Sequence, residues 1–470
     1  MNYHPLIGLE IHIELLTNSK MFSCAPNTYG QEANTKTAPL DFAFPGTMPS
    51  INKQAVIHAL RMCNALHMEI DHELIFERKN YFYSDLPKGY QITQESRPIG
   101  RNGYVTIDNN KIEIERLHLE EDTCKQLHYD NYTLLDYNRA GIPLIEVVTT
   151  PSIYSPKLAK KFVEHIRDIV TYLEVSDGRM ENGSLRVDVN VSLINDKNSK
   201  KYNKVEIKNL NSITNIERAI EYEMNRQTNL LKEGKTIEQE TRRYDDKNKE
   251  TLPLRKKEDA VDYRFFIDTN IAPIKLSYKF IEDAISSSKE LKEERLLRYK
   301  RLGLSEYDAS LLVDDKDISD YYDSLLTVGV DPKIGVNFIN GEIRKYLNKT
   351  GQDIKHFCIS VTSLAQLLRL YEEEKISYKQ ARDIFDKMLN ANKSVDEIVK
   401  ESDFLIISSE EELIKIINKI LDDNEQAISD FKAGKKRALG YIVGLVMKKT
   451  MGKANPSLTT KLVNEMIIRR

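Results

Sequence analysis

The clearest alternation of apolar and polar residues lies at the start of the chain. Residues 7–15 read IGLEIHIEL, so isoleucine or leucine occupies every second position. A period of two predicts a β-strand with one apolar and one polar face. The polar face carries Glu10, His12 and Glu14 in a row. Two carboxylates that flank an imidazole can hold a divalent metal ion, and a merely charged, solvated strand face is the alternative at this point.

Further strands follow the same logic. Residues 103–121 predict a hairpin with its turn at 108–110, and the apolar phase slips near Glu115 and Arg116, which predicts a β-bulge. Residues 185–192 alternate cleanly, and 205–208 form a short third strand. The polar face of the 185–192 strand carries Arg186, Asp188 and Asn190. We expect one sheet whose open polar face is the functional site.

Helical spacing of apolar residues predicts helices over 52–68, from Ser155 onward and over 213–232. Ser155 is a suitable N-cap because Pro156 follows it at the first helical position. From about residue 275 strand alternation stops and helical patterning continues to the end. A length of 470 residues favours two or three domains. We place the boundaries so that the domains span 1–290, 291–405 and 406–470.

Composition narrows the class of protein. The net charge is −3, so any nucleic-acid-binding surface must be local. Residues 432–470 have an excess of nine positive charges and are the candidate for RNA backbone contact, the alternative being a solvated lysine-rich surface. The four cysteines form no C-x-x-C pair. With no signal-peptide pattern and no run long enough to span a membrane, we expect a cytoplasmic protein, or one of an organelle's matrix or stroma if an organelle encodes it.

Three other segments carry candidate chemistry. Residues 118–122 read HLEED, and such adjacent carboxylates repel one another unless a cation or solvent relieves them. Glu146 interrupts an apolar strand over 143–148, so it needs a cation or a hydrogen-bond partner. Residues 78–91 mix lysine and arginine with tyrosine, which suits a phosphate and a stacked base, or else forms an ordinary surface loop.

The common nucleotide-binding and hydrolase motifs are absent. Residues 234–236 read GKT, but Asn229 stands where a P-loop has its first glycine, and a helix precedes the motif. No G-x-G-x-x-G, H-E-x-x-H or G-x-S-x-G pattern occurs. If ATP binds here, it binds without a Walker loop.

Taken together, these motifs resemble the B subunits of the glutamyl/aspartyl-tRNA amidotransferases, the GatB family. The similarity covers essentially the full length and follows the family's order, through segments 7–15, 20–23, 78–91, 117–122, 136–146, 181–192, 206–212, 239–244, 262–266 and 452–456. It implies an α+β fold with a cradle-shaped α/β kinase domain built on a mostly antiparallel sheet. A helical domain and a small helical tail domain resembling the YqeY family would follow.

The resemblance also implies an activity and partners. The chain would work in a heterotrimer with an amidase-type A subunit, which makes ammonia from glutamine, and a small C subunit. Its substrate would be tRNA mischarged with glutamate or aspartate. ATP would phosphorylate the side-chain carboxylate, and ammonia arriving through a tunnel would displace the phosphate. A carboxylate resists amination because oxide is a poor leaving group, so this activation is chemically reasonable.

The family's site residues map onto this chain by resemblance. His12, Glu121 and Glu146 would hold one Mg²⁺, and Glu10 and Glu120 a second that arrives with ATP; Mn²⁺ can substitute. These five residues are the expected catalytic and metal-binding set. The residues expected around the phosphates or the tunnel are Lys79, Lys88, Arg186, Asp188 and Asn190.

Some positions depart from the family pattern. Many members carry paired cysteines that bind zinc after the first strand and before a Pro-Gly turn. Here the first region has only Cys24 and the second reads DFAFPG over 41–46, so we expect no zinc site. Two alternatives stay open: an archaeal E-type subunit without its inserted domain, and a non-catalytic tRNA-binding scaffold. A scaffold has no need of five metal-ligand residues.

Overall fold

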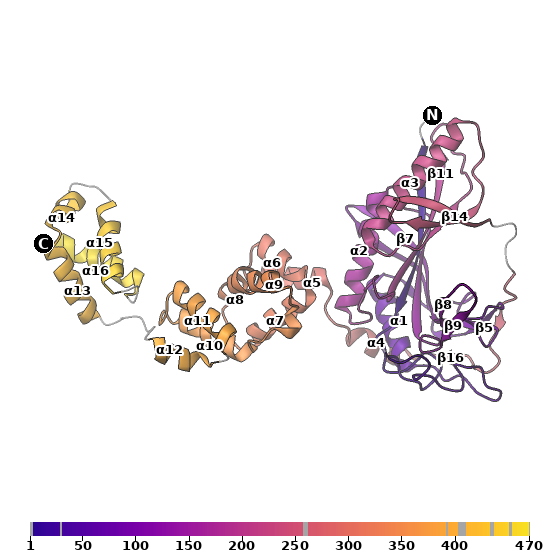
Figure 1. The fold of residues 1–470 in the computed structure, drawn as a ribbon, viewed down its shortest axis with the longest axis horizontal. Helices are drawn as coiled ribbons and strands as arrows, with labels where there is room; N and C mark the ends of the chain where they lie inside the picture. The colour runs from indigo at the N-terminus through magenta and orange to yellow at the C-terminus, as the bar shows by residue number, and fades with distance from the viewer. Residues whose placement is uncertain are drawn as a thin grey trace. The chain divides into compact units, whose positions relative to one another are not determined.

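The computed structural model describes residues 3–28, 31–256, 262–391, 393–402, 410–432, 437–450 and 454–469. The chain divides into two compact units, Met1–Lys292 and Glu293–Arg470 (Figure 1). The first unit is mixed α+β and the second is helical. Among the described helices, none has both the length and the apolar character needed to cross a membrane.

A nine-stranded sheet is the framework of the first unit. Every neighbouring pair is antiparallel except β12 and β13, which are parallel. In their order across the sheet, the strands are β14 (Glu250–Lys256), β13 (Glu240–Asp245), β12 (Val205–Lys208), β11 (Leu185–Asn195), β1 (Tyr3–Glu14), β10 (Pro143–Thr149), β7 (Asn110–Glu121), β6 (Gly100–Ile107) and β2 (Glu69–Ile70). The mostly antiparallel sheet is thus confirmed.

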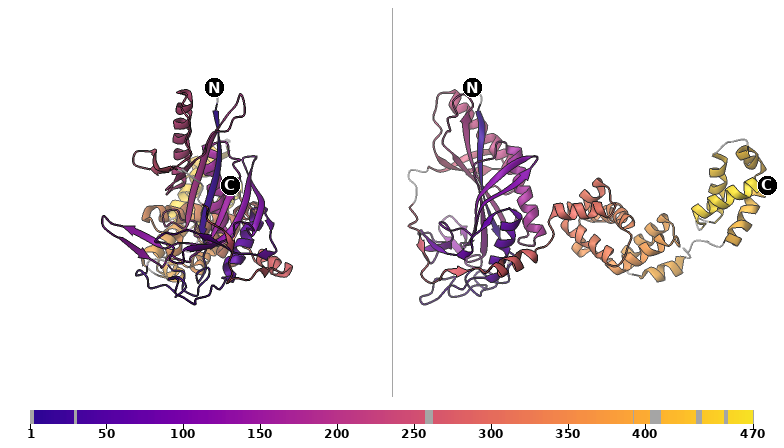
Figure 2. Two further views of the ribbon diagram at one scale, coloured as in Figure 1. Left: turned by 90° about the vertical axis from the view of Figure 1, so that its right-hand side faces the viewer. Right: turned by 180° about the vertical axis from the view of Figure 1, so that it is seen from behind.

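The apolar face of the sheet is buried under helices. The side chains of β1 on this face are at most 1% exposed: Ile7, Leu9, Ile11 and Ile13. Burial of each such side chain contributes about 1.5–3 kcal/mol. The covering helices are α1 (Lys53–Ala65), α2 (Pro156–Tyr172) and α3 (Ile213–Lys232), which lie along one side of the sheet in Figure 1 and, seen from behind, in Figure 2. Their N-caps are Asn52, Ser155 and Ser212, and the cap at Ser155 is the predicted one.

The register of the central strands brings distant segments together. His12 of β1 lies opposite Glu146 of β10, which in turn lies opposite His118 of β7. The ladder between β10 and β7 then skips Glu115, because Val148 pairs with Arg116 and the next residue pairs with Ile114. The predicted bulge is therefore confirmed. Strands β12, β11 and β1 lie in one sheet, as expected, and they are neighbours in it.

Three small sheets complete the first unit. One consists of β15 (Phe266–Ile267), β4 (Glu77–Asn80) and β5 (Tyr90–Thr93), and β5 packs against β7. The others pair β16 (Ile274–Lys275) with β3 (Glu73–Leu74) and β8 (Lys125–His128) with β9 (Thr133–Asp136). Helix α4 (Tyr278–Ser286) contacts α1. The packing of β5 on β7 matters for the site, because it covers the end of the strand that carries Glu121.

The second unit contains only helices among its described elements. They are α5 (Lys292–Arg301, which starts at the unit boundary), α6 (Glu306–Val313), α7 (Lys316–Thr327), α8 (Pro332–Phe338), η1 (Ile339–Ile343), α9 (Arg344–Thr350), η2 (Ile354–His356), α10 (Val361–Glu372), α11 (Tyr378–Ala391), α12 (Val395–Ser402), α13 (Glu410–Asp422), α14 (Glu425–Lys432), α15 (Arg437–Lys449) and α16 (Pro456–Arg469). Helices α13 to α16 share a separate apolar core that includes Leu413, Ile417 and Val446. The predicted boundary at 405/406 lies outside the described residues, as do the tail cations Lys435, Lys436, Lys453 and Arg470.

Candidate active site on the polar face of the sheet

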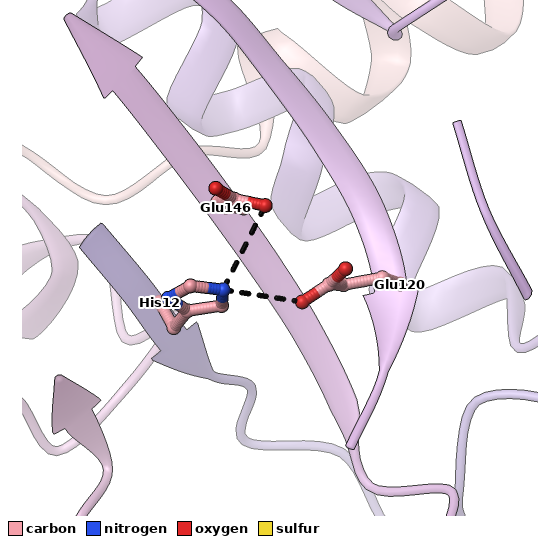
Figure 3. A group of neighbouring side chains, drawn as sticks. All are labelled: His12, Glu120 and Glu146. Carbon is pink, nitrogen blue, oxygen red and sulfur yellow. Dashed lines mark ion pairs between the residues drawn. The ribbon is translucent and has the colours of Figure 1, made fainter. Parts of the chain in front are cut away.

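The best-defined group of potential metal ligands comes from the three central strands. His12 of β1, Glu120 of β7 and Glu146 of β10 point toward one another (Figure 3). The Nε2 atom of His12 lies 3.4 Å from Oε1 of Glu120 and 3.7 Å from Oε2 of Glu146. One donor atom from each residue lies within 4.8 Å of the other two. We call these three residues the His12 group.

A second imidazole supports the two carboxylates of the His12 group. His118 lies opposite Glu146 in the sheet, and its side chain is 2% exposed. Its Nε2 atom is 3.0 Å from Oε2 of Glu146 and 3.6 Å from Oε2 of Glu120. Its Nδ1 atom is buried and has no hydrogen-bond partner in the part of the chain that the structure describes. His118 therefore orients both carboxylates from the protein side.

The negative charge of Glu146 and the positive charge of His118 stabilise each other. Burial by itself raises the pKa of Glu146, but the two imidazoles His12 and His118 prevail and hold it below its usual range. Burial likewise lowers the pKa of His118, yet the neighbouring Glu146 and Glu120 carboxylates raise it to about 9. Glu146 is thus kept as a carboxylate and His118 as its charged donor.

A second group of carboxylates lies on the same face, two strands further along. Glu10 of β1, Asp188 of β11 and Glu206 of β12 each place one oxygen within 4.8 Å of the others, and we call them the Asp188 group. Lys208 forms ion pairs with Asp188 and, at 3.2 Å, with Glu206. Asn190 donates a 2.9 Å hydrogen bond to Glu10. Burial and then the neighbouring Glu146 and Asp188 charges raise the pKa of Glu10.

The structure groups the predicted ligands differently from the family-based expectation. The resemblance puts Glu121 with His12 and Glu146, whereas here Glu120 occupies that place. Successive residues of a strand point to opposite faces, so Glu120 shares the face of His118 and Glu121 does not. The Glu121 carboxylate instead accepts a hydrogen bond from Lys88 and a 3.0 Å bond from the Ile92 backbone N–H of β5.

Four of the other five predicted residues contact these groups or the residues at the end of β7, and the contact described for the fifth is with an aromatic ring. Arg186 donates a 2.8 Å hydrogen bond to Asp122, which follows Glu121 directly. Asp188 and Asn190 belong to or contact the Asp188 group, and Lys88 holds Glu121. Lys79 of β4 lies instead over the Tyr263 ring, 4.8 Å from its centroid.

The polar row of β1 ends at Glu14. Its side chain is almost fully buried, and burial together with the nearby Asp122 charge raises the pKa of Glu14 to about 8, against the opposing effect of Arg186. Glu14 of β1 and Glu120 of β7 both lie opposite Leu144 of β10, so only this residue separates them across the sheet. The polar face therefore extends from the Asp188 group through the His12 group to Glu14.

Sequence reasoning assigned no role to His118, Glu206 or Lys208. Period-two alternation on β7 already places His118 on the face of Glu120, so that signal was available. Glu206 and Lys208 also alternate on one face of β12, but nothing in the chain order says that β12 lies beside β11, which lies beside β1. Their place in the site follows from the strand order alone.

The donor types indicate which ion fits. Carboxylate oxygens with at most one imidazole suit Mg²⁺ or Mn²⁺, which prefer hard oxygen ligands. The His12 group offers two carboxylates and one imidazole, and the Asp188 group offers three carboxylates. The buried, partnerless Nδ1 of His118 leaves its Nε2 committed to the carboxylates. Both groups fit a divalent cation.

Comparison with known proteins identifies the family. Residues 5–282 match the family described as the GatB/GatE catalytic domain, and residues 320–467 match the GatB domain. The chain is 42% identical over 475 residues to the B subunit of the aspartyl/glutamyl-tRNA(Asn/Gln) amidotransferase of Lysinibacillus sphaericus. It is also 42% identical over 476 residues to the protein of the same name from Bacillus cytotoxicus, and both alignments cover all of both chains. This chain belongs to the GatB family of amidotransferase B subunits, the family that its sequence motifs resemble.

Proposed function

We propose that this chain is the B subunit of a cytoplasmic tRNA-dependent amidotransferase and that it activates the side-chain carboxylate of glutamate or aspartate carried by mischarged tRNA. ATP is the phosphoryl donor, and ammonia is the nitrogen donor. The supporting observation is the pair of carboxylate groups on one sheet face, three strands of which supply the His12 group. Transfer of a phosphoryl group to a carboxylate brings anions together, so the site needs cations more than a strong base.

We assign a different cation-binding role to each of the two groups. The His12 group would hold one Mg²⁺ or Mn²⁺, and the Asp188 group would hold a second together with the phosphates of ATP. Bound divalent cations supply neutralisation of the phosphate oxygens. Lys208 and Arg186 are positioned beside this face and add fixed positive charge to it. Lys88 forms an ion pair with Glu121 at the end of β7 and borders the same site.

The two steps of the reaction need only ATP and ammonia besides the substrate carboxylate. The substrate carboxylate oxygen attacks the γ-phosphorus of ATP, the bond to ADP breaks, and an acyl phosphate forms. The lone pair of ammonia then attacks the acyl carbon, and the carbon–oxygen bond to phosphate breaks. The surplus proton leaves with the phosphate as hydrogen phosphate, and the side chain becomes an amide. Amidase-type A and small C subunits are the partners that we propose for the supply of ammonia.

We also propose a three-part organisation, with a cradle-shaped kinase domain over 1–290, a helical domain over 291–405 and a tail domain over 406–470 that contacts the tRNA backbone. The excess of positive charge in 432–470 supports the last point. Deletion of 432–470 should weaken tRNA binding and reduce the salt dependence of the dissociation constant, because each lost phosphate contact lowers the slope by about one. An unchanged slope would argue against a tail contact.

The test of the function is ATP cleavage by the assembled complex in Mg²⁺, with mischarged tRNA, correctly charged tRNA or no tRNA. We expect ADP to form at an appreciable rate only with mischarged tRNA, and with a phosphorylated side chain trapped when glutamine and ammonia are left out. Binding of tRNA without any ATP cleavage would favour the scaffold alternative.

A further inference from the structure

The end of β7, which carries His118, Glu120 and Glu121, has a strand neighbour on one side only. Its pairing with β10 continues through Glu121, whereas its pairing with β6 ends at Leu117, opposite Gly100. Among the described strands, none continues the ladder beyond Leu117 on the β6 side. Buried backbone N–H and C=O groups are nearly always hydrogen-bonded in proteins, so this edge needs partners of another kind.

Two glutamine side chains supply these partners. Oε1 of Gln94 accepts a 3.1 Å hydrogen bond from the backbone N–H of Leu119, and Nε2 of Gln91 donates a 2.7 Å bond to the backbone carbonyl oxygen of Glu121. In an antiparallel ladder every second residue directs its backbone groups to the same neighbour, and Leu117, Leu119 and Glu121 form such a series. The two side chains therefore continue the side of the ladder that β6 leaves at Leu117.

Gln94 bridges two segments as the peptide group of a strand would. Its Nε2 atom donates a 3.2 Å hydrogen bond to the Ile75 carbonyl oxygen, so its amide offers an acceptor to β7 and a donor to the segment before β4. Gln94 is 0% exposed and Gln91 is 7% exposed. A buried amide whose two ends are both bonded to backbone has a fixed orientation, and it fixes the backbone to which it is bonded.

The residues held in this way flank a member of the His12 group. Glu120 lies between Leu119 and Glu121, and its Oε2 atom is 3.5 Å from the Thr93 hydroxyl of β5. Successive residues of a strand point to opposite faces, so a twist of this strand end would turn Glu120 away from His12. The bonds from β5 and from Gln94 therefore fix which carboxylate faces His12.

We propose that Gln91 and Gln94 are positioning residues of the active site: their side-chain amides take the place of a strand beside β7 and hold Glu120 toward His12. This inference rests on the proposed function, in which the His12 group holds a divalent cation. Neither glutamine is a member of that group; each acts through the backbone of β7. Loss of a group that orients a metal ligand lowers metal affinity or activity by about 10–100-fold.

The experiment measures Mn²⁺ binding to the assembled complex by equilibrium dialysis for the wild type, Gln94→Met and Gln91→Met. Methionine has a similar length but lacks the amide donor and the carbonyl acceptor. We expect the Mn²⁺ affinity to fall about tenfold in Gln94→Met, which loses two bonds, and less in Gln91→Met.

Gln227→Met is the matched control for the loss of a buried glutamine. Gln227 of α3 is 0% exposed and donates a 3.2 Å hydrogen bond to the Val191 carbonyl oxygen of β11, on the helix-covered side of the sheet. This variant should lose stability but bind Mn²⁺ as tightly as the wild type, because no member of the His12 group lies on β11.

Two further readouts separate positioning from stability. Hydrogen exchange in a peptide over 117–122 should accelerate in Gln94→Met and not in Gln227→Met, because the Leu119 N–H loses its acceptor. The rate of ATP cleavage by Gln94→Met should recover at high Mn²⁺ concentration, since mass action fills a weakened site.

A wild type that binds Mn²⁺ but cleaves no ATP with mischarged tRNA would overturn the proposed function, and the comparison of Mn²⁺ affinities would still decide the role of the two glutamines. If Gln94→Met does not assemble, Gln91→Met decides. Equal Mn²⁺ affinities of the wild type and the assembled variants would show that the glutamines only stabilise the fold.

Discussion

The His12 group and the Asp188 group lie on one sheet face but differ in the cation that the chain itself provides. In the His12 group the partners of the carboxylates are the imidazoles of His12 and His118, and His12 can itself become a metal ligand. In the Asp188 group the partner is the Lys208 ammonium, which donates hydrogen bonds and offers no lone pair. An incoming metal ion therefore joins His12 but competes with Lys208.

This difference suggests different occupancies for the two groups. The His12 group combines three donors, and its resident cation, the buried His118, contacts the two carboxylates from the protein side, so we expect the group to bind a divalent ion on its own. The Asp188 group is already partly neutralised by Lys208, so we expect it to bind a metal ion weakly until the phosphates of ATP add negative charge. The number of carboxylates alone therefore does not determine how tightly a site binds a metal ion. A positively charged side chain already in the site affects the affinity as much.

The largest effect should come from breaking the His12 group. Glu146→Gln removes the carboxylate that contacts both imidazoles. We expect the rate of tRNA-dependent ATP cleavage to fall by about 10³-fold or more, because a lost ligand carboxylate takes away several kcal/mol of charge stabilisation. Glu113→Gln, an exposed carboxylate on the same strand as Glu120, is the control and should retain activity. A loss below tenfold in Glu146→Gln would separate this group from catalysis.

A matched pair of variants tests whether Glu120 or Glu121 belongs to the His12 group. Glu120→Gln should weaken Mn²⁺ binding by about 10–100-fold, since Glu120 faces His12 directly. Glu121→Gln should bind Mn²⁺ nearly as well as the wild type and lose rate instead, because Lys88 is left without its carboxylate partner. Equilibrium dialysis of Mn²⁺ and the ATP-cleavage rate give both numbers. The opposite order would restore Glu121 to the ligand set.

The Asp188 group is tested by removing its competitor. Lys208→Gln deletes the ammonium group that pairs with Asp188 and Glu206. Two unit charges about 4 Å apart interact by about 4 kcal/mol at an effective dielectric constant of 20, and even a screened fraction of this gives about a tenfold gain in Mn²⁺ affinity. Lys204 is exposed just before β12, and the control variant Lys204→Gln should bind Mn²⁺ as tightly as the wild type. Weaker binding in Lys208→Gln would contradict the account of competition.

The smallest expected effect is on the pH dependence of the free energy of unfolding. This dependence must be known before the effects of acid on the His12 group and the Asp188 group are compared. His58 lies outside both groups, and burial lowers its pKa from the ordinary 6.5. Because the folded protein favours the neutral ring, its contribution to stability is complete above pH 6.5 and declines as the pH falls toward the lowered value, by at most about 1.4 kcal/mol per pH unit.

Chemical denaturation between pH 7 and 5 measures this contribution. His58→Gln should lose part of the pH dependence of the unfolding free energy, because a glutamine does not titrate. His128→Gln, which alters an exposed histidine of β8, should keep the dependence of the wild type. Identical slopes for wild type and His58→Gln would mean that other groups carry the acid sensitivity.

Much of the fold was predictable because it is written in local periodicity. Alternation gave the strands that carry Glu10, His12 and Asp188, and the phase slip revealed the bulge at Glu115. Serine before a helical pattern predicted the cap at 155. Such features depend only on neighbours along the chain.

The grouping of the site residues was not predictable in this way. Whether Glu120 or Glu121 faces His12 depends on the strand face at the end of β7 and on β5, which covers Glu121. The place of Glu206 depends on the order β12-β11-β1, which brings residues almost 200 positions apart into one group. Contacts of this kind are set by packing between distant segments, and no local pattern contains them.

We expect the polar face of the sheet to hold a divalent ion at the His12 group. The most direct test is a crystal of the complex soaked in Mn²⁺ without ATP and examined by anomalous scattering. The account predicts a strong peak among His12, Glu120 and Glu146, and a weak or absent one at the Asp188 group until a non-hydrolysable ATP analogue is added. A peak at the Asp188 group alone, or none at the His12 group, would contradict it.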